Sequence, residues 1–313
     1  MPDYLIAVRN THAGRFGNEP GPVRFLRVPD GADPQPEQRI SRKMWVDEVL
    51  AHAHTGRNPL TGKGCGDIVV LVHGYNTTPA AVLARHRQLQ RDLPAAGFNG
   101  TLVSFDWPSD DRAINYLEDR SDAKITALKL VDDGIATLAA TQYRGCEINL
   151  HVVAHSMGCY VLREAFDDAD DRPAIAASNW NVSQIYLVGA DISSTSMSAG
   201  DARSRSLYRH CTRLTNYQNP YDAVLKLSDV KRAGVAPRAG RRGLPGDAPS
   251  NAVNVNCGRY FNQTFADRRD NGHSWHFADP VFLADLAQTL AGNLDRRVVA
   301  RRVSDESGNL LLA

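Results

Sequence analysis

A serine between a predicted strand and a predicted helix is the residue of this chain best placed to do chemistry. Ser156 lies in the run AHSMG (154–158), after a β-branched apolar stretch at 148–153 and before helically spaced apolar residues at 161–166. Because no residues are left for a loop, the strand must become the helix within one tight turn. Small residues at both ends of the run fit that crowding. The pattern predicts a nucleophile elbow, which projects the serine hydroxyl from the end of the strand.

A serine hydroxyl is a poor nucleophile near neutral pH, so it needs a base, and the base needs an acid that fixes its tautomer. His273 is predicted as the base, because it lies in the Gly-flanked stretch DNGHSWH (270–276), where a turn could bring it over the elbow. His276 is the alternative base. Whichever of the two is not the base is expected to be an ordinary surface-loop histidine.

Two aspartates compete for the role of the acid. Asp222 follows a predicted strand at 211–217 and is favoured, although it could simply cap the helix that comes after it. Asp191 follows the strand at 184–189 and is the rival. It could instead shape the pocket or cap the next helix.

The elements that position these residues alternate between strands and helices, which indicates a mostly parallel sheet with ligands bound beyond the carboxyl ends of its strands. His73, Asp106, Ser156, Asp191 and Asp222 all fall at such ends. Expected strands span 4–8, 23–28, 67–72, 101–105, 148–153, 184–189, 211–217 and 252–257, and expected helices 40–54, 78–93, 121–141 and 280–294. The Gly- and Pro-rich stretch 14–22 and the stretch 234–250 are expected to be loops, the second one mobile. The tail from 298 is expected to form a small hairpin or to be partly disordered.

Five short motifs give the chain a resemblance to alpha/beta hydrolases, and more narrowly to an esterase-like bacterial branch whose members are mostly of unassigned function. They are LVHGYN (71–76), FDWPS (105–109), HSMG (155–158), NPYD (219–222) and GHSW (272–275), in the order of that family. The resemblance covers roughly 67–290, and Ala154 stands where glycine is commoner. It implies an α/β fold with a mostly parallel central sheet flanked by helices and little or no lid. It also implies the catalytic set Ser156, Asp222 and His273.

An attacked carbonyl needs hydrogen-bond donors for the negative charge that develops on its oxygen. Met157 follows the nucleophile, so its N–H is one expected donor. The resemblance implies the N–H of Tyr75 as the second. The other residues expected to form or support the pocket, with both histidines as structural support and Trp107 as a wall or as packing beneath the loop, are His73, Gly74, Asn76, Trp107, His155 and Asp191.

Composition and length constrain the remaining expectations. The 313 residues suit a single alpha/beta-hydrolase domain over 1–313, with a core at about 67–294, N-terminal strands and a helix at 1–66 and a tail at 295–313. A net charge of +1 offers no general field for nucleic acid or an acidic membrane. No stretch is apolar enough to span a bilayer, and the N-terminus lacks the pattern of a signal peptide. Five cysteines without zinc spacing suggest reduced thiols in a cytoplasmic protein.

The predicted function is hydrolysis of a small-molecule carboxylic ester or thioester through an acyl-enzyme on Ser156, with no metal or organic cofactor. The short interval 191–209 leaves no room for a large lid, so an open site is expected and long-chain triglyceride is disfavoured. A basic cluster of Lys231, Arg232, Arg238, Arg241 and Arg242 could be a solvated loop or could attract an anionic substrate. The alternatives are an amidase, an acyltransferase, or a catalytically silent binding or scaffold protein with the same fold.

Overall fold

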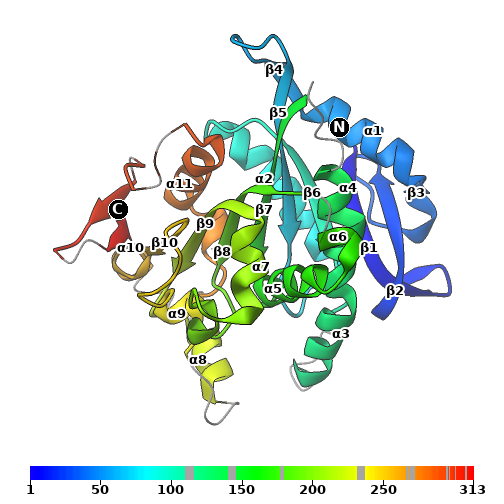
Figure 1. Ribbon diagram of the computed structural model, residues 1–313. Helices are drawn as coiled ribbons and strands as arrows, with labels where there is room; N and C mark the ends of the chain where they lie inside the picture. The colour runs from blue at the N-terminus through cyan, green and yellow to red at the C-terminus, as the bar shows by residue number, and fades with distance from the viewer. Residues whose placement is uncertain are drawn as a thin grey trace.

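The structure is a computed structural model that describes residues 1–109, 116–139, 146–176, 180–230, 237–265, 267, 272–293, 295, 297–299, 301–306 and 309–313. Within these ranges the strands form one twelve-stranded sheet (Figure 1). Its order is β11-β12-β10-β9-β8-β7-β5-β6-β1-β2-β3, with β4 paired to β5. The strands are β1 (Asp3–His12), β2 (Arg15–Val28), β3 (Arg39–Ile40), β4 (His54–Arg57), β5 (Gly64–Val72), β6 (Thr101–Asp106), β7 (Cys146–His155), β8 (Val182–Val188), β9 (Cys211–Gln218), β10 (Ala252–Asn256), β11 (Arg302–Ser304) and β12 (Leu310–Leu312).

The centre of the sheet, from β1 through β6, β5, β7, β8 and β9 to β10, is parallel throughout. Its residues are apolar on both faces: Ile68, Val70 and Val72 of β5 face one core cluster, whereas Val69 and Leu71 face the other. Burial on both faces is the reason for the continuous apolar runs in the sequence. The expectation of a mostly parallel sheet flanked by helices is confirmed.

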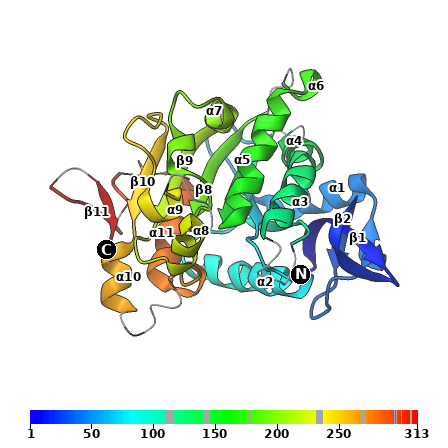
Figure 2. The ribbon, with the colours of Figure 1, turned by 90° about the horizontal axis from the view of Figure 1, so that it is seen from below.

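Helices cover both faces of this sheet (Figure 2). One core cluster contains residues of α1, α3, α5 and α7, and the opposite cluster contains residues of α2, α10 and α11. The helices are α1 (Arg42–Ala53), α2 (Pro79–Ala95), α3 (Tyr116–Lys129), α4 (Ala136–Ala139), α5 (Met157–Asp170), α6 (Pro173–Ala176), α7 (Ala202–Arg209), α8 (Ala223–Val230), α9 (Ala239–Arg242), α10 (Gly258–Thr264) and α11 (Pro280–Ala291).

Two helices begin at a side-chain cap followed by proline. The Thr78 hydroxyl accepts the N–H of Ala81 and Pro79 opens α2, while the Asp279 carboxylate accepts the N–H of Phe282 at the start of α11. Between β8 and β9 the chain forms only a short 3-10 turn (Ser194–Met197) and α7. The absence of a large lid at this point agrees with the expectation.

The stretch 14–22 was expected to be a loop, but most of it belongs to a long hairpin of β1 and β2. Ala13 and Gly14 adopt positive φ values of 47° and 74°, which close a tight turn. Two register shifts follow in the ladder, and a Cβ on Gly21 would lie 2.3 Å from the carbonyl oxygen of Arg9. The glycine here permits close strand contact at an irregular ladder and does not mark a loop.

The helix expected at 121–141 is also different in detail. The chain passes from α3 through a π-helical segment (Leu130–Ile135) into α4. A π-turn inserts an extra residue and therefore rotates the apolar face. Ile125, which regular helical spacing would place on one stripe with Leu128, Val131, Ile135 and Leu138, is 59% exposed, whereas Ala123 and Ala127 are buried.

The described part of the stretch 234–250, residues 237–250, contains α9 and packs on the protein. Arg238 is 2% exposed and forms an ion pair with Asp191, so the interpretation of this arginine as part of a solvated or substrate-attracting patch is wrong. Lys231 and Arg232 lie outside the described residues. The tail does form the expected hairpin, and β12 also joins β10 in parallel. No helix among the described residues is long and apolar enough to cross a membrane.

Candidate active site

Ser156 occupies a strained turn between β7 and α5. Its φ of 54° and ψ of −124° lie outside the regions that a non-glycine residue normally adopts. The Ser156 N–H donates to the carbonyl of Val188 on the neighbouring strand at 3.0 Å, which helps to hold this conformation. A Cβ on Gly158 would lie 2.4 Å from the His73 carbonyl oxygen, so only glycine fits there, while Ala154 is accommodated with no exposed surface. This is the elbow geometry that the sequence predicts.

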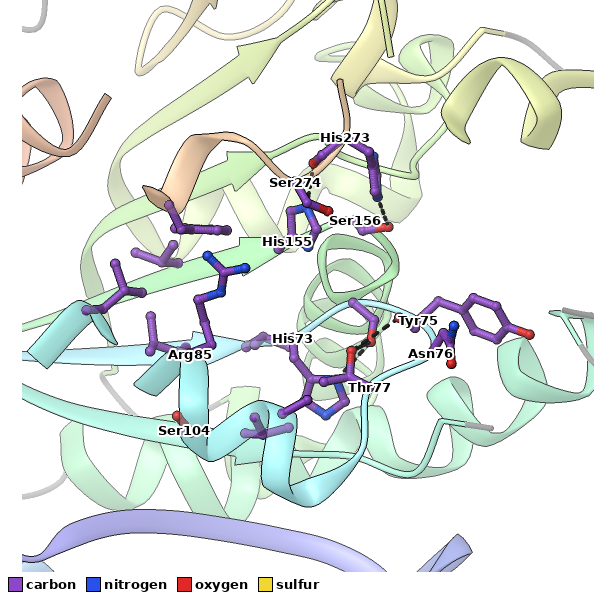
Figure 3. Close-up of a pocket in the computed structure, with 18 residues that line it drawn as sticks. His73, Tyr75, Asn76, Thr77, Arg85, Ser104, His155, Ser156, His273 and Ser274 are labelled. Atoms are coloured by element: carbon purple, nitrogen blue, oxygen red, sulfur yellow. Dashed lines mark hydrogen bonds between the residues drawn. The ribbon is translucent and has the colours of Figure 1, made fainter. Parts of the chain in front are cut away.

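A continuous chain of hydrogen bonds runs from Ser156 through His273 to Asp222. Ser156 Oγ and His273 Nε2 are 2.8 Å apart (Figure 3), and His273 Nδ1 lies 2.7 Å from Asp222 Oδ2. An ionised carboxylate only accepts, so Nδ1 carries the proton and Nε2 is left to accept the serine proton. All three residues are buried, with Asp222 completely so.

Asp222 makes the contacts expected of both alternatives that the sequence left open, the acid beside His273 and the helix cap. While Oδ2 receives the His273 proton, Oδ1 accepts the N–H of Leu225 at 2.9 Å at the start of α8. Asp191 does not reach His273, because it forms an ion pair with Arg238 at 3.0 Å. The Asp191 N–H donates to the Ser156 carbonyl at 3.1 Å, so Asp191 lies beside the elbow, although it is not among the residues that line the pocket. Its ion pair with Arg238 argues against the role of rival acid.

Two side chains fix the backbone that carries His273. Asn219 Nδ2 donates to the carbonyl of Gly272, and His155 Nε2 donates to the carbonyl of His273, both at 2.9 Å. Burial, together with the proximity of His273, lowers the pKa of His155 to about 3, so this imidazole is neutral and keeps its proton on Nε2. His276 is fully buried rather than on the surface, which corrects the expectation for the histidine that is not the base.

The HGYN segment after β5 is held by side chains on β6 and the residues that follow it. His73 Nδ1 donates to the Gly74 carbonyl at 2.8 Å, and its Nε2 accepts the N–H of Trp107 at 3.2 Å. The Trp107 indole stacks on the His73 ring and donates to the His73 carbonyl at 2.8 Å. Trp107 is completely buried and does not line the pocket, so it packs beneath the loop and is not a wall of the site.

A buried ion pair supports the same segment from below. Asp106 at the end of β6 accepts from Arg9 Nε at 2.7 Å, and Arg9 Nη2 donates to the Thr77 carbonyl at 2.8 Å. Burial alone would raise the pKa of Asp106, but the charge of Arg9 and the neighbouring His73 hold it below its usual value. The carboxylate is therefore a fixed negative anchor for the loop.

A pocket of about 270 Å³ opens beside Ser156 (Figure 3). Tyr75, Gly74 and Asn76 line it as expected, and a Cβ on Gly74 would lie only 2.8 Å from Ser156 Cβ. Met157 does not line the pocket with its side chain, but it is the first residue of α5, where N–H groups lack intrahelical partners. Among the described residues, no group of three or more His, Cys, Asp or Glu side chains is arranged to hold a metal ion.

Several residues that line the pocket were not predicted, and two of them have side chains that bear on ligand binding. Arg85 and Phe277 line the pocket together with Ser156 and His273. Phe277 follows GHSW closely, but nothing in its own type singles it out. Arg85 had a detectable signal: it stands three residues after Val82 and four before Leu89, so the helical period places a cation on the apolar face of α2.

Comparisons with solved structures find alpha/beta folds of low similarity. Lipase B from Aspergillus fumigatus is 14% identical, with 93% of this chain and 67% of that chain covered and a TM-score of 0.41. A cutinase-like protein from Cryptococcus sp. is 11% identical, with 76% and 97% covered and a TM-score of 0.37. Esterase B from Lactobacillus rhamnosis is 10% identical, with 73% and 79% covered and a TM-score of 0.34. At these values none of the three informs the activity of this chain.

A comparison with curated proteins finds no match. A protein-family model described as "Alpha/beta hydrolase of unknown function (DUF900)" matches residues 53–242, which is more than half of the chain. The matched segment contains the HGYN loop, the elbow and Asp222. By this match the chain belongs to that family of alpha/beta hydrolases.

Proposed function

We propose that this protein is a serine hydrolase that cleaves a carboxylic ester or thioester through an acyl-enzyme on Ser156. The observation that carries the proposal is the unbroken hydrogen-bond chain from Ser156 Oγ through His273 to Asp222, with distances of 2.8 and 2.7 Å. Such a chain is what converts a weakly nucleophilic hydroxyl into an attacking group.

The acylation step uses each of these residues once. Ser156 Oγ attacks the carbonyl carbon while His273 Nε2 takes its proton, and Asp222 holds the Nδ1–H and stabilises the imidazolium. His273 then gives the proton to the departing alcohol or thiol. In the second half, His273 takes a proton from water, the resulting hydroxide attacks the acyl carbon, and the acid leaves as Ser156 regains its proton.

The backbone N–H groups of Met157 and Tyr75 are the proposed donors to the oxyanion. Two features support this assignment: Met157 begins α5, and Gly74 lies against Ser156, which brings the adjoining loop residue next to the nucleophile. Loss of one such donor typically raises the barrier by about 3–4 kcal/mol. The short segment between β8 and β9 favours small esters over long-chain triglycerides.

Labelling with a fluorophosphonate probe tests the proposal. Intact mass should show a single adduct on the wild-type protein, and the adduct should be absent from Ser156→Ala. Ser274→Ala is the matched control, because Ser274 lines the same pocket and should leave the adduct in place. Undiminished labelling or ester turnover in folded Ser156→Ala would refute the assignment.

A further inference from the structure

Arg85 projects from α2 into the same pocket that contains Ser156 and His273 (Figure 3). Around it the pocket wall is apolar, with side chains from β5, α2, β7 and the segment before α11: Leu71, Val82, Leu89, Val153 and Phe277. A charged group in such surroundings is unusual and calls for a partner.

That partner is missing among the described residues. The Arg85 Nη1 atom is buried and makes no hydrogen bond, and the guanidinium lies over the Phe277 ring at 4.9 Å. An aromatic face attracts a cation but accepts none of its strong hydrogen bonds. Arg85 as a whole keeps some exposure, whereas the buried arginines Arg9 and Arg302 pair with Asp106 and Asp285.

The surrounding groups leave the positive charge of Arg85 in place. Burial lowers the pKa of Arg85, yet a guanidinium remains protonated in proteins. His155 is neutral, because burial and the proximity of His273 lower its pKa to about 3. Its Nε2–H already donates a hydrogen bond to the His273 carbonyl. Ser104 also lines the pocket, and its hydroxyl is bonded to His86, whose pKa burial lowers to about 4. Among the described residues that line this pocket, none carries a carboxylate that could compete for Arg85.

We propose that Arg85 binds a carboxylate carried by the substrate, so that the preferred esters have a negative charge on the group that enters this pocket. The planar fork of a guanidinium matches a carboxylate in a bidentate arrangement. The apolar walls would hold a hydrocarbon spacer between that carboxylate and the ester carbon attacked by Ser156. The hydrolytic part of this inference rests on the proposed function, whereas the binding part can be tested without turnover.

Paired substrates give the first test. In the first arm, which places the charge on the acyl side, monomethyl esters of the linear dicarboxylic acids from succinate to suberate are compared with methyl esters of monocarboxylic acids of equal length. In the second arm, acetyl esters of ω-hydroxy acids place the charge on the alcohol side and are compared with acetyl esters of uncharged alcohols of equal length. We expect kcat/KM to favour the charged member of a pair in one of the two arms. The spacer length at the maximum would measure the distance from the ester to Arg85. Equal or lower kcat/KM for every charged ester would overturn the proposal.

Substitution of Arg85 gives the second test. Arg85→Met removes the charge but keeps an unbranched apolar side chain, and should reduce the charged-to-neutral ratio of kcat/KM on the order of 10- to 100-fold. Arg85→Lys keeps the charge without the fork and should retain part of the preference. Arg91→Met is the matched control, because Arg91 lies on the same helix, is 71% exposed and pairs with Asp92. If the charged-to-neutral ratio of kcat/KM falls equally in Arg91→Met, the effect comes from the net charge of the protein and the proposal is overturned.

Binding to the Ser156→Ala protein separates this inference from the proposed function. Calorimetric titration with the preferred half-ester, or with adipate if no ester is hydrolysed, should show binding that weakens at least 10-fold when Arg85→Met is added. If this binding is observed but the wild-type protein hydrolyses no ester, the proposed hydrolase function is refuted and the proposed anion site is supported. If the wild-type protein hydrolyses esters but neither binding nor substrate preference depends on Arg85, the proposed hydrolase function stands and the proposed anion site is refuted. If Arg85→Met does not fold, Arg85→Lys serves in both measurements.

Discussion

Asp222 and Asp191 follow neighbouring parallel strands, β9 and β8, but they have different partners. Asp222 accepts from His273 Nδ1 at 2.7 Å, whereas Asp191 pairs with Arg238 at 3.0 Å. Both side chains are almost completely buried. A position at the end of a strand therefore brings a carboxylate to the carboxyl edge of the parallel sheet. The group packed against the carboxylate then decides what the carboxylate can do. A histidine partner permits proton transfer, whereas an arginine partner links two backbone segments.

The largest expected effect is on turnover in Asp222→Asn. The amide cannot hold His273 in the tautomer that accepts the serine proton, so kcat should fall about 10⁴-fold. Asparagine caps helices as well as aspartate, so α8 should remain formed. Hydrolysis of p-nitrophenyl acetate measures the loss, and Asp191→Asn should retain kcat within about 10-fold. Similar losses in both variants would remove the functional distinction between the two carboxylates.

For stability, we expect the substitution of Asp191 to have a larger effect than the substitution of Asp222. Asp191→Asn leaves the Arg238 guanidinium buried without its counter-charge, which should lower the free energy of unfolding by about 3–5 kcal/mol. Urea denaturation at neutral pH measures this. Asp191→Leu combined with Arg238→Met removes both charges and should recover much of the loss. A double variant no more stable than Asp191→Asn would contradict the ion-pair explanation.

Histidines extend the comparison. His273 Nδ1 lies 2.7 Å from the Asp222 carboxylate, whereas His86 Nδ1 lies 2.9 Å from the Ser104 hydroxyl and His86 Nε2 lies 3.7 Å from Asp3 Oδ1. Burial and the nearby Arg87 lower the pKa of His86 from 6.5 to about 4. The unfolded chain therefore binds this proton first, and stability is lost as the pH falls from about 6.5 to about 4. At pH values above about 6.5, the lowered pKa of His86 should contribute about 3 kcal/mol to the free energy of unfolding. Free energies of unfolding measured at intervals across this range should fall less in His86→Gln, and an unchanged slope would count against the shift.

The smallest expected effect concerns the contact between the HGYN loop and Ser156. A methyl group from Gly74→Ala would lie 2.8 Å from Ser156 Cβ and 3.2 Å from His155 Nδ1, so the serine must move. Displacement on the order of 1 Å can cost about 100-fold in rate. Gly246→Ala is the control, because its Cβ would meet no atom within 4 Å. Equal kcat in the two variants would show that the loop can yield without disturbing Ser156.

Local patterns predicted the parts of this molecule that depend on neighbouring residues. The elbow around Ser156 follows from strand and helix periodicities that meet without a loop, and the Thr78 cap follows from its Pro79 neighbour. The motif order indicated that Asp222 and His273 would face Ser156, and the structure brings these side chains into hydrogen-bond contact. Their catalytic roles stay a prediction.

Partners chosen by tertiary packing could not be read from the sequence. Nothing near Asp191 indicates that Arg238 will be buried against it, and nothing near Trp107 indicates that its indole will stack on His73. Helical spacing places Arg85 on the apolar face of α2, but nothing in the sequence indicates that Phe277 will lie against its guanidinium. Gly21 suggested a loop because glycine marks both turns and close strand contacts, and only the register of β1 and β2 separates the two.

The two ends of the sheet have a consequence for how the molecule behaves at high concentration. The wide sheet ends in the three-residue strand β11 on one side, whereas on the other side the two-residue strand β3 pairs with only two residues of the long strand β2. Long open edges invite strands of other molecules to add by backbone hydrogen bonding, and very short edge strands deny them a template. The β12 strand covers what would otherwise be the open edge of β10, and Arg302 of the adjoining strand β11 anchors the hairpin to Asp285. At this edge of the sheet the hairpin therefore leaves only a three-residue strand to which another molecule could add, and none of its residues lines the pocket.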